Sequence, residues 1–237
     1  MTGAVGVVFD LDGVLVDSEH LWERGWARYA GDHGVSWTDL DTASCQGQST
    51  AEWSGHLGQR SGRPATEVAQ AVIAGLVASY EAGEVPMLPG ARELVEAVAG
   101  RVPVALASSA PRAVIDLVMN VMGMGPFFSA TVSSAEVERG KPSPDVYREA
   151  VRRIGVDAAR SYAVEDSSNG VRAASAAGLT VIAVPTPRYH LDDDATHRAL
   201  RVVATRDQVR DALTQLIADG ETGHPHPHVA PRAGGAG

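Results

Sequence analysis

Residues 5–19, VGVVFDLDGVLVDSE, constrain the fold more than any other stretch, because an apolar run leads directly into two acids. Residues 7–9 are β-branched or aromatic, which is typical of a strand buried on both faces of a parallel sheet. Asp10 then lies at the carboxyl end of that strand, where open α/β sheets bind their ligands. Asp12 is two residues further, so both carboxylates leave an extended chain on the same side. Two acids held this close need a cation or a proton between them. The spacing therefore predicts a metal site, an acid/base pair, or both.

Two other roles for these acids compete with that interpretation. An acid at a strand end often caps a helix or forms a turn. A calcium-binding EF-hand loop beginning at Asp10 would need an oxygen ligand, a glycine and a carboxylate at its fifth, sixth and twelfth positions. Those positions hold Val14, Leu15 and Leu21, so the sequence excludes an EF-hand.

Composition limits the classes of partner. The chain has 237 residues, 44% of them hydrophobic, which suits one core with an insertion better than two full domains. Its net charge of -9 and the lack of a basic run argue against nucleic-acid phosphates and anionic membranes as partners. The first ten residues lack the pattern of a secretory signal, and apolar stretches such as residues 102–107 are too short to span a bilayer. We expect a soluble cytoplasmic protein that is a monomer or a weak dimer.

Cysteine has no predicted role in the chemistry. Cys45 is the only cysteine, which excludes an internal disulfide and a cysteine-based zinc cluster. No neighbouring feature supports it as a nucleophile, so we interpret it as a partly buried thiol.

The first half of the chain after the strand is predicted to be helical. Residues 18–32 indicate a helix capped by Ser18, with an apolar stripe at helical spacing. Further helices are expected from about residue 49 or 50 and after Pro64, where Val68, Val72, Leu76 and Tyr80 recur at four-residue steps. No strand signal occurs between residues 17 and 85, which makes this segment too large for an ordinary loop. We interpret residues 17–85 as an all-helical insertion.

The remainder alternates between strands and helices. Strands are predicted over residues 102–107, 130–132, 161–164 and 180–184, helices over 91–99, 112–122, 144–154 and 169–177, and a last strand and helix over 201–218. This alternation indicates an α/β protein with a Rossmann-like, mainly parallel sheet covered on both faces. Residues 1–16 and 86–219 would form the core. Residues 220–237 have little to bury and should form a disordered tail, in which His224, His226 and His228 more plausibly have no role than bind a metal.

Three further segments place polar groups where the chain enters a helix. Ser108 ends the strand in VALASSA, and its hydroxyl would face an anion at a helix N-terminus unless it is only a cap. Lys141 lies in RGKPSPDVY, a turn that lacks the residues of a nucleotide-binding P-loop. Glu165 and Asp166 follow a second buried strand in AVEDSSNGVRAA. Acids at two strand ends together suggest a hard, oxygen-rich site suited to Mg²⁺.

Taken in order, DLDGVLVDSE and these three segments resemble the four motifs of the haloacid dehalogenase superfamily, in its magnesium-dependent phosphatase and phosphomutase branch. The resemblance covers roughly residues 5–190. It implies that Asp10 attacks phosphorus and forms an aspartyl-phosphate, and that Asp12 acts as general acid and then base. It further implies that Ser108, Ser109 and Lys141 hold the phosphoryl oxygens. The expected Mg²⁺ ligands are Asp10, the main-chain carbonyl of Asp12, Asp166 and Glu165.

The resemblance also gives the helical insertion a function. In this family such an insertion is a cap that closes over the phosphate and selects the substrate. The cap would hold all four tryptophans, Trp22, Trp26, Trp37 and Trp53. Aromatic stripes usually pack inward, so we expect a cap core, although one or two rings facing the cleft would suit a sugar.

The cap residues bear on the reaction. The expected substrate-binding residues are His20, Trp22, Gly47 and Thr50. The β-phosphoglucomutase that this sequence resembles has a histidine where Trp22 stands and a phosphate-binding arginine where Thr50 stands. Loss of that cationic clamp disfavours a bisphosphate intermediate. We therefore predict a Mg²⁺-dependent phosphatase of a small sugar or polyol phosphate, with a β-phosphoglucomutase-type mutase as the alternative.

Two further classes are disfavoured. A hydrolytic dehalogenase lacks the second acid, and a non-catalytic module would be expected to have lost a reacting group.

Overall fold

The centre of the fold is a parallel sheet. The computed structural model of the protein describes residues 4–45, 48–186 and 190–221. Six strands lie in the order β3-β2-β1-β4-β5-β6, and each neighbouring pair is parallel. They are β1 (Val7–Phe9), β2 (Val104–Ser108), β3 (Ala130–Ser133), β4 (Tyr162–Glu165), β5 (Thr180–Ala183) and β6 (Arg201–Val202). The predicted Rossmann-like α/β class is confirmed.

The helices fall into two groups along the chain. Between β1 and β2 come α1 (Glu19–Asp32), α2 (Asp39–Cys45), α3 (Thr50–Ser61), α4 (Ala65–Glu81) and α5 (Ala91–Ala99). The later helices are α6 (Arg112–Val121), α7 (Asp145–Ile154), α8 (Ser168–Ala176), α9 (Asp193–Arg198) and α10 (Arg206–Glu221), with short 3₁₀ turns η1 (Gly125–Phe127), η2 (Ser134–Glu136) and η3 (Ala158–Arg160). The sequence analysis missed α2 and α9, which are too short to show a helical period. Helix α10 continues to Glu221, so the first two residues of the expected tail are helical and the rest lies outside the described residues.

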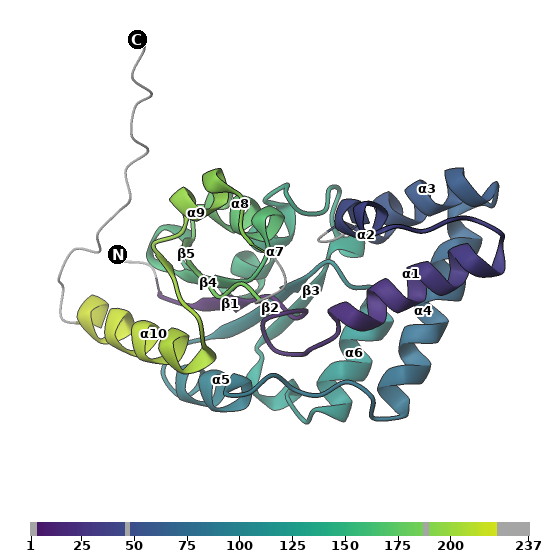
Figure 1. Ribbon diagram of the computed structural model, residues 1–237. Helices are drawn as coiled ribbons and strands as arrows, with labels where there is room; N and C mark the ends of the chain where they lie inside the picture. Colours follow the sequence, from purple (N-terminus) through teal and green to yellow (C-terminus); the bar gives the residue numbers. More distant parts are fainter. Residues whose placement is uncertain (1–3, 46–47, 187–189, 222–237) are drawn as a thin grey trace, which may run out of the picture.

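Helices cover both faces of the sheet, because side chains alternate along each strand. In β1, Val7 and Phe9 belong to the apolar cluster that includes α5, α6 and α10, whereas Val8 belongs to the second cluster, which includes α7 and α8. Figure 1 shows the two layers, with α5 and α10 on one side of the sheet and α7, α8 and α9 on the other. The near-continuous apolar strands of the sequence are explained by this burial on both faces.

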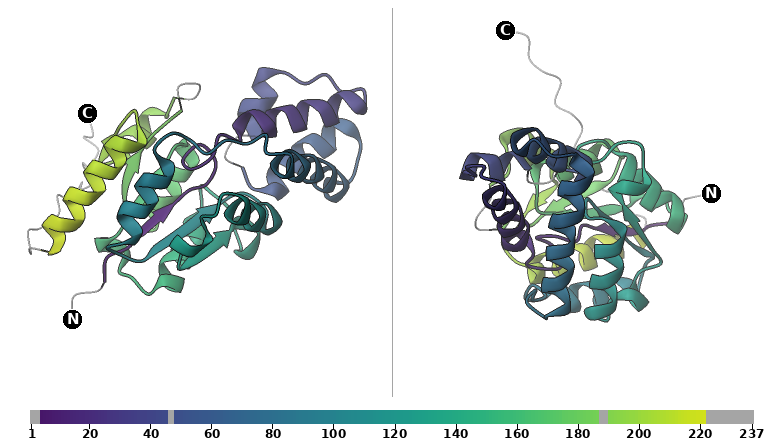
Figure 2. Two further views of the ribbon diagram at one scale, coloured as in Figure 1. Left: turned by 90° about the horizontal axis from the view of Figure 1, so that it is seen from below. Right: turned by 90° about the vertical axis from the view of Figure 1, so that its right-hand side faces the viewer.

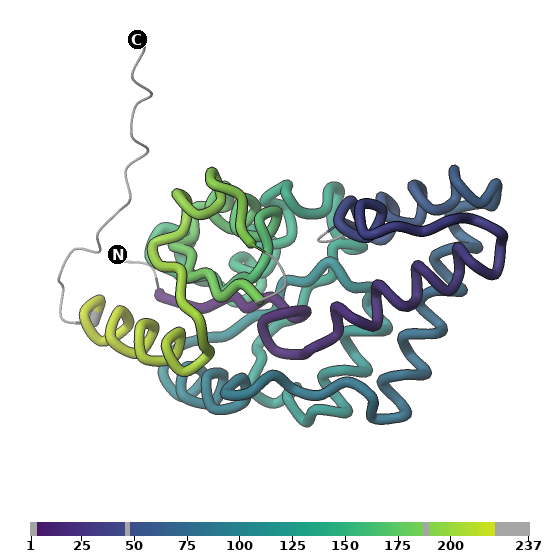
Figure 3. Tube along the Cα trace, viewed as in Figure 1, coloured from purple at the N-terminus to yellow at the C-terminus, as the bar shows by residue number. Residues whose placement is uncertain are grey.

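Helices α1 to α4 lie to one side of the sheet (Figure 2), and α4 packs against α6. Val68, Val72, Leu76 and Tyr80 of α4 are all buried, as their spacing predicted. Figure 3 follows the chain out to these helices along residues 10–18 and back along residues 82–90. The division of the chain into core and cap remains a proposal. In the part of the chain that the structure describes, no helix is both long and apolar enough to cross a membrane.

The two chain segments that lead to and from helices α1 to α4 are hydrogen-bonded to each other. Asp17 N–H donates to the Pro86 carbonyl at 3.1 Å, and Leu88 N–H donates to the Leu15 carbonyl at 2.9 Å. Paired backbone on both connections restricts how helices α1 to α4 can move relative to the sheet.

Ser18 lies at the predicted N-cap of α1, but its side chain does not cap the helix. It instead donates to Asp12 Oδ1. The later helix α3 does have a capping box, in which Ser49 N–H donates to Glu52 Oε2 at 2.8 Å.

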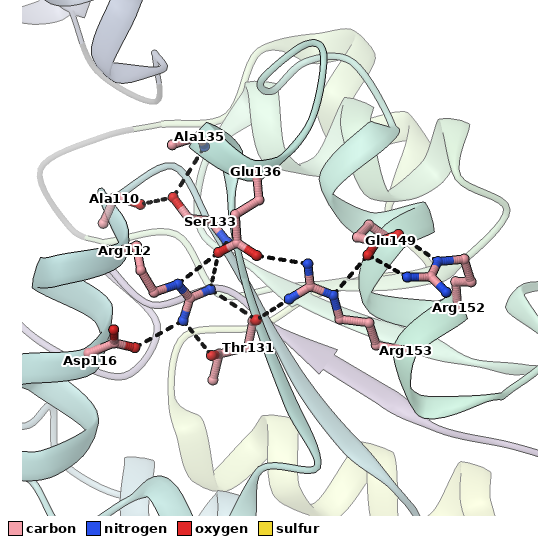
Figure 4. Close-up of polar contacts among 10 residues, drawn as sticks. All are labelled: Ala110, Arg112, Asp116, Thr131, Ser133, Ala135, Glu136, Glu149, Arg152 and Arg153. Carbon is pink, nitrogen blue, oxygen red and sulfur yellow. Dashed lines mark hydrogen bonds and ion pairs between the residues drawn. The ribbon is translucent and has the colours of Figure 1, made fainter.

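Strand β3 lies at the edge of the sheet, and side chains cover its outward backbone groups (Figure 4). The Thr131 carbonyl accepts from Arg112 Nη2 at 3.0 Å and from Arg153 Nη1 at 2.9 Å. Ser133 N–H donates to Glu136 Oε1 at 3.2 Å, and Glu136 also accepts from both arginines. An uncovered edge is a template for pairing with another chain, so this network shields the edge.

We therefore expect Glu136→Ala to weaken the β3 edge. The substitution removes the acceptor that holds both arginines over Thr131. It should lower the free energy of unfolding by about 1 kcal/mol and increase self-association. Urea unfolding followed by circular dichroism, together with size-exclusion chromatography, measures both effects. The control is Glu138→Ala, which removes an exposed acid two residues later. Equal stability and oligomeric state for the two variants would contradict the role of Glu136.

Candidate active site

The carboxyl ends of three neighbouring strands carry the polar residues that the motifs predicted. Asp10 directly follows β1, Ser108 ends β2 and Glu165 ends β4. Because β1 lies between β2 and β4, the topology brings these residues together. The chain runs from β1 outward to β3 and then returns to the other side of β1, which is where doubly wound sheets bind ligands.

Lys141 joins two of these strand ends. Its Nζ donates to Asp10 Oδ1 at 2.7 Å and to Glu165 Oε1 at 2.6 Å, and the residue is only 2% exposed. Burial alone would lower the pKa of Lys141, but the two carboxylates outweigh it and the pKa is raised. The amine therefore stays charged at neutral pH, and it neutralises part of the charge of the acids.

Glu165 is saturated with hydrogen bonds. Besides Lys141, its Oε1 accepts from Tyr147 Oη at 2.7 Å. Its Oε2 accepts from the N–H groups of Asp166 and Ser167 and from Ser167 Oγ, at 3.1 to 3.2 Å. A Cβ at Gly170 would overlap this carboxylate, so glycine is required there. With so many donors in place, Glu165 is better arranged to orient Lys141 than to bind a cation directly.

Asp166 has the opposite character. Asp166 is 6% exposed, and Lys141 and Tyr147 donate to Glu165 rather than to it. Burial raises the pKa of Asp166 well above its ordinary range, and Glu165 and Asp10 add to the rise. A Cβ at Gly13, whose φ is +73°, would overlap Asp166 Oδ2, so glycine leaves room for this carboxylate.

The acids fit a hard divalent cation. Oxygens of Asp10, Glu165 and Asp166 lie within 4.8 Å of one another and are buried. Three acids face one lysine, so either a carboxyl carries a proton or a further cation is bound. Oxygen ligands of this kind suit Mg²⁺ or a similar ion, with Asp10 and Asp166 as the carboxylates that are best placed to hold it.

Asp12 faces the first helix rather than Lys141. Its Oδ1 accepts from Ser18 Oγ and, at 3.2 Å, from Trp22 Nε1. Burial raises the pKa of Asp12, although the hydrogen bonds from Ser18 and Trp22 oppose the rise. A carboxyl with a raised pKa holds its proton more readily than an exposed one, which suits a general acid.

The two serines after β2 occupy different positions. Ser108 is fully buried, and its Oγ accepts from Ala110 N–H at 3.0 Å. Ser109 lines the cavity beside Asp10, and its Oγ has no partner among the described residues. Ser133 Oγ donates to the Ala110 carbonyl at 2.6 Å (Figure 4), so the β3 edge also supports this loop. Ser109 is therefore the better placed of the two for direct contact with an anion.

A cavity of about 430 Å³ opens beside these groups. Its lining combines the acids and Lys141 with residues from the helical insertion. The main lining residues are Asp10, Asp12, Glu19, Trp22, Trp26, Cys45, Gln48, Trp53, Ser109, Lys141, Asp166, Asn169, Arg172, His190 and Asp192.

Three tryptophans both form the core of the insertion and line this cavity. The rings of Trp22, Trp26 and Trp53 lie 5.8 to 6.0 Å apart, and each residue is at most 9% exposed. The inward packing predicted from the sequence is therefore correct for these three, which also line the cavity. Trp37 lies elsewhere, against Arg60.

Only some of the cap residues expected to bind substrate line the cavity. Trp22 lines the cavity, but His20 and Thr50 are not among its lining residues, and His20 Nδ1 lies 3.8 Å from Asp17 Oδ1. Gly47 lies outside the described residues. Cys45 also lines the cavity, where burial raises its pKa to about 11. This makes Cys45 an unreactive thiol, as expected.

Sequence reasoning missed two groups in the cavity. Glu19 is the first residue of α1, where an acid is usually assigned to the helix dipole. Burial raises the pKa of Glu19 to about 7, although Thr186 Oγ1 donates to it at 3.2 Å. Arg172 lines the cavity too, and it pairs with Asp192 at 2.5 Å and with Asp194. The sequence gives no sign of either contact, because Thr186 is 167 residues from Glu19 and Asp192 is 20 residues from Arg172.

Known proteins agree with this geometry. A family model described as haloacid dehalogenase-like hydrolase matches residues 5–178. The chain is 31% identical over 200 residues to hexitol phosphatase B of Escherichia coli K12, covering 79% of this chain and 86% of that protein. It is 29% identical over 226 residues to validoxylamine A 7'-phosphate phosphatase of Streptomyces hygroscopicus subsp. limoneus, covering 94% and 97%.

A solved structure supports the same conclusion. CbbY from Rhodobacter sphaeroides in complex with phosphate superposes with a TM-score of 0.75 at 25% identity, covering 87% of this chain and 96% of that one. The strand-end acids, the buried lysine and these matches together show that the chain belongs to the haloacid dehalogenase-like hydrolases.

Proposed function

We propose that the protein is a Mg²⁺-dependent phosphatase that hydrolyses a small sugar or polyol monophosphate through an aspartyl-phosphate intermediate. The observation that carries this proposal is the buried cluster of Asp10, Lys141, Glu165 and Asp166 beside a 430 Å³ cavity. The phosphatase activities named for the relatives support it.

Asp10 would be the nucleophile. One carboxylate oxygen of Asp10 forms a bond to phosphorus as the bond from phosphorus to the substrate oxygen breaks. Asp12 gives its proton to that leaving oxygen, so an alcohol departs. Asp12 then takes a proton from a water that attacks the phosphorus, which releases inorganic phosphate and restores Asp10.

The remaining groups would bind and orient the phosphoryl group. Lys141 and Ser109 are placed to donate to its oxygens, and Ser108 is the second candidate donor. Asp10, Asp166 and the main-chain carbonyl of Asp12 would hold the Mg²⁺, with Glu165 orienting Lys141. When bound, Mg²⁺ would neutralise phosphate charge.

The charges of the cavity favour a phosphatase over a mutase. Among the described residues that line it, the permanently charged cations are Lys141 and Arg172. Lys141 is committed to Asp10, and Arg172 is paired with two acids. A bisphosphate intermediate would need a second cationic clamp, and no unpaired one is present in this lining. His20 is not among the lining residues, so it does not supply an imidazole there for a mutase.

The cavity wall suits a hydroxylated substrate with an apolar face. Trp22, Trp26 and Trp53 in the lining give a ring or a chain of C–H groups an apolar surface to pack on. Glu19 offers a carboxylate to substrate hydroxyls on the same lining. This combination supports a sugar or polyol phosphate as the substrate class.

The first experiment is a substrate panel. We expect inorganic phosphate release from sugar or polyol monophosphates with Mg²⁺, and a loss of at least about a hundredfold after removal of the metal with EDTA. Hexitol phosphates and nucleoside monophosphates should be included. Glucose 1-phosphate should be followed for isomerisation in the same assay. Conversion to glucose 6-phosphate without phosphate release would instead establish the mutase.

The second experiment tests the nucleophile and the lysine. Asp10→Asn should abolish turnover, because the amide cannot attack phosphorus. Lys141→Ala should lower kcat/KM by about three orders of magnitude, because it removes the cation from the phosphoryl site. Arg139→Ala removes an exposed cation from the same turn and should leave kcat/KM unchanged. Full activity in either active-site variant would refute the assigned roles.

The lysine also offers a direct spectroscopic readout. Lys141 is the only lysine in the chain, so ¹⁵N-lysine labelling gives a single side-chain ammonium signal. That signal should shift on addition of inorganic phosphate with Mg²⁺ and be absent in Lys141→Ala.

The third experiment tests the space that Gly13 leaves for Asp166. Gly13→Ala should weaken Mn²⁺ binding by at least about tenfold, because the new Cβ displaces the Asp166 carboxylate. Electron paramagnetic resonance of free Mn²⁺ measures this without an activity assay. Gly34→Ala is the matched control, since Gly34 has φ +71° but nothing lies within 4 Å of a Cβ built there. It should lose only about 1 to 2 kcal/mol of stability. Equal Mn²⁺ affinities would show that Asp166 is not a ligand.

A further inference from the structure

Arg206 reaches from the last helix to the turn that follows the catalytic strand. It is the first residue of α10, 192 residues after Val14, and it is only 9% exposed. Its Nε donates to the Val14 carbonyl at 3.2 Å, and its Nη2 donates to the Gly13 carbonyl. A buried guanidinium on two main-chain carbonyls fixes both the position and the direction of that backbone.

The turn that Arg206 holds is the one that positions Asp12. Gly13 N–H donates to the Val16 carbonyl at 3.0 Å, and Leu15 N–H donates to the Leu11 carbonyl at 2.8 Å. These bonds close the turn on itself but tie it to no helix of the sheet. Among the described residues, Arg206 of the core donates side-chain hydrogen bonds to the carbonyls of this turn. This contact therefore holds the backbone that directly follows Asp12, whose carboxylate is also held by Ser18 and Trp22.

The surroundings are adapted to the guanidinium. Burial lowers the pKa of Arg206, while Asp166, Asp17 and Glu19 act in the opposite direction. An arginine remains charged under all physiological conditions, so it is a permanent cation beneath these acids. Gly90, with φ +78°, lies against the start of this side chain, since a Cβ there would be 3.3 Å from Arg206 Cβ.

We propose that Arg206 is a positioning residue that holds the Gly13–Val14 turn so that Asp12 points its carboxyl at the leaving oxygen. This inference rests on the phosphatase function proposed above, because it assigns Arg206 to the proton transfer of that reaction. Arg206 itself does not touch the reacting atoms. Its loss should weaken protonation of the leaving oxygen by Asp12 while leaving the nucleophile Asp10 in place.

Substrates with different leaving groups distinguish a loss of protonation from a loss of the nucleophile. An alkoxide leaves slowly without a proton, so hydrolysis of a sugar phosphate depends on the general acid. The 4-nitrophenolate ion leaves readily without one. We expect Arg206→Met to lower kcat/KM by about ten- to a hundredfold for the best sugar or polyol phosphate of the panel, but by less than about threefold for 4-nitrophenyl phosphate. General loss of structure would lower both values alike.

Two variants keep the test decisive. Arg206→Lys retains the charge but reaches at most one of the two carbonyls. Its kcat/KM for the sugar phosphate should therefore lie between those of the wild type and Arg206→Met. It also serves if Arg206→Met does not fold, as judged by thermal unfolding. Arg210→Met is the control, since Arg210 lies one turn further along α10 and pairs with Asp207 and Asp211 on the helix surface. Its kcat/KM should match the wild type with both substrates.

A double-mutant cycle with Asp12→Asn identifies the residue through which Arg206 acts. Asp12→Asn alone should show the same leaving-group selectivity more strongly. Adding Arg206→Met to it should then cost little more on the sugar phosphate. Equal losses on both substrates, full additivity with Asp12→Asn, or wild-type kinetics in folded Arg206→Met and Arg206→Lys would each overturn the proposal. Failure of the wild type to release phosphate from either substrate would instead overturn the phosphatase function.

Discussion

The buried charge balance around Lys141 determines the arrangement of the rest of the site. One ammonium group lies between Asp10 and Glu165, both removed from water. In such surroundings an unpaired charge is expensive, so every other group must compensate. Tyr147 and the Ser167 backbone satisfy Glu165, which leaves Asp10 and Asp166 as the carboxylates still short of positive charge. Such a group of buried acids is suited to a divalent cation, which would supply the missing positive charge.

The parallel sheet makes this balance possible. Its central strand places Asp10 between the ends of β2 and β4, and the crossover after β3 delivers Lys141 to the same edge. Two glycines complete the arrangement, since side chains at Gly13 or Gly170 would occupy the space of the Asp166 and Glu165 carboxylates. Close packing of acids is therefore a property of the backbone as much as of the acids themselves.

How much the sequence predicts depends on how local each interaction is. The strand-end acids and Lys141 belong to short motifs in which a strand, a turn and a helix follow one another, and these were predicted together with the α/β fold. Short helices such as α2 and α9 were not, because one or two turns show no periodicity. In the sequence, Glu19 looks like any acid at the start of a helix. Only the folded chain brings Thr186 into contact with it. Arg206 gave no signal, since its acceptors are carbonyl groups 192 residues and more away and any sequence provides those.

Asp12 lies where the helical insertion and the sheet meet, and both parts hold it. From the insertion, Ser18 and Trp22 donate to its carboxylate. From the core, Arg206 holds the carbonyl of Gly13, the residue that follows it. Different contacts can therefore set two properties of this carboxyl. The donors and burial set its proton affinity, and the backbone sets the direction in which the carboxyl points. In the proposed mechanism, proton transfer would therefore depend on contacts from both the insertion and the core, whereas the nucleophile Asp10 is held by Lys141 at the end of β1.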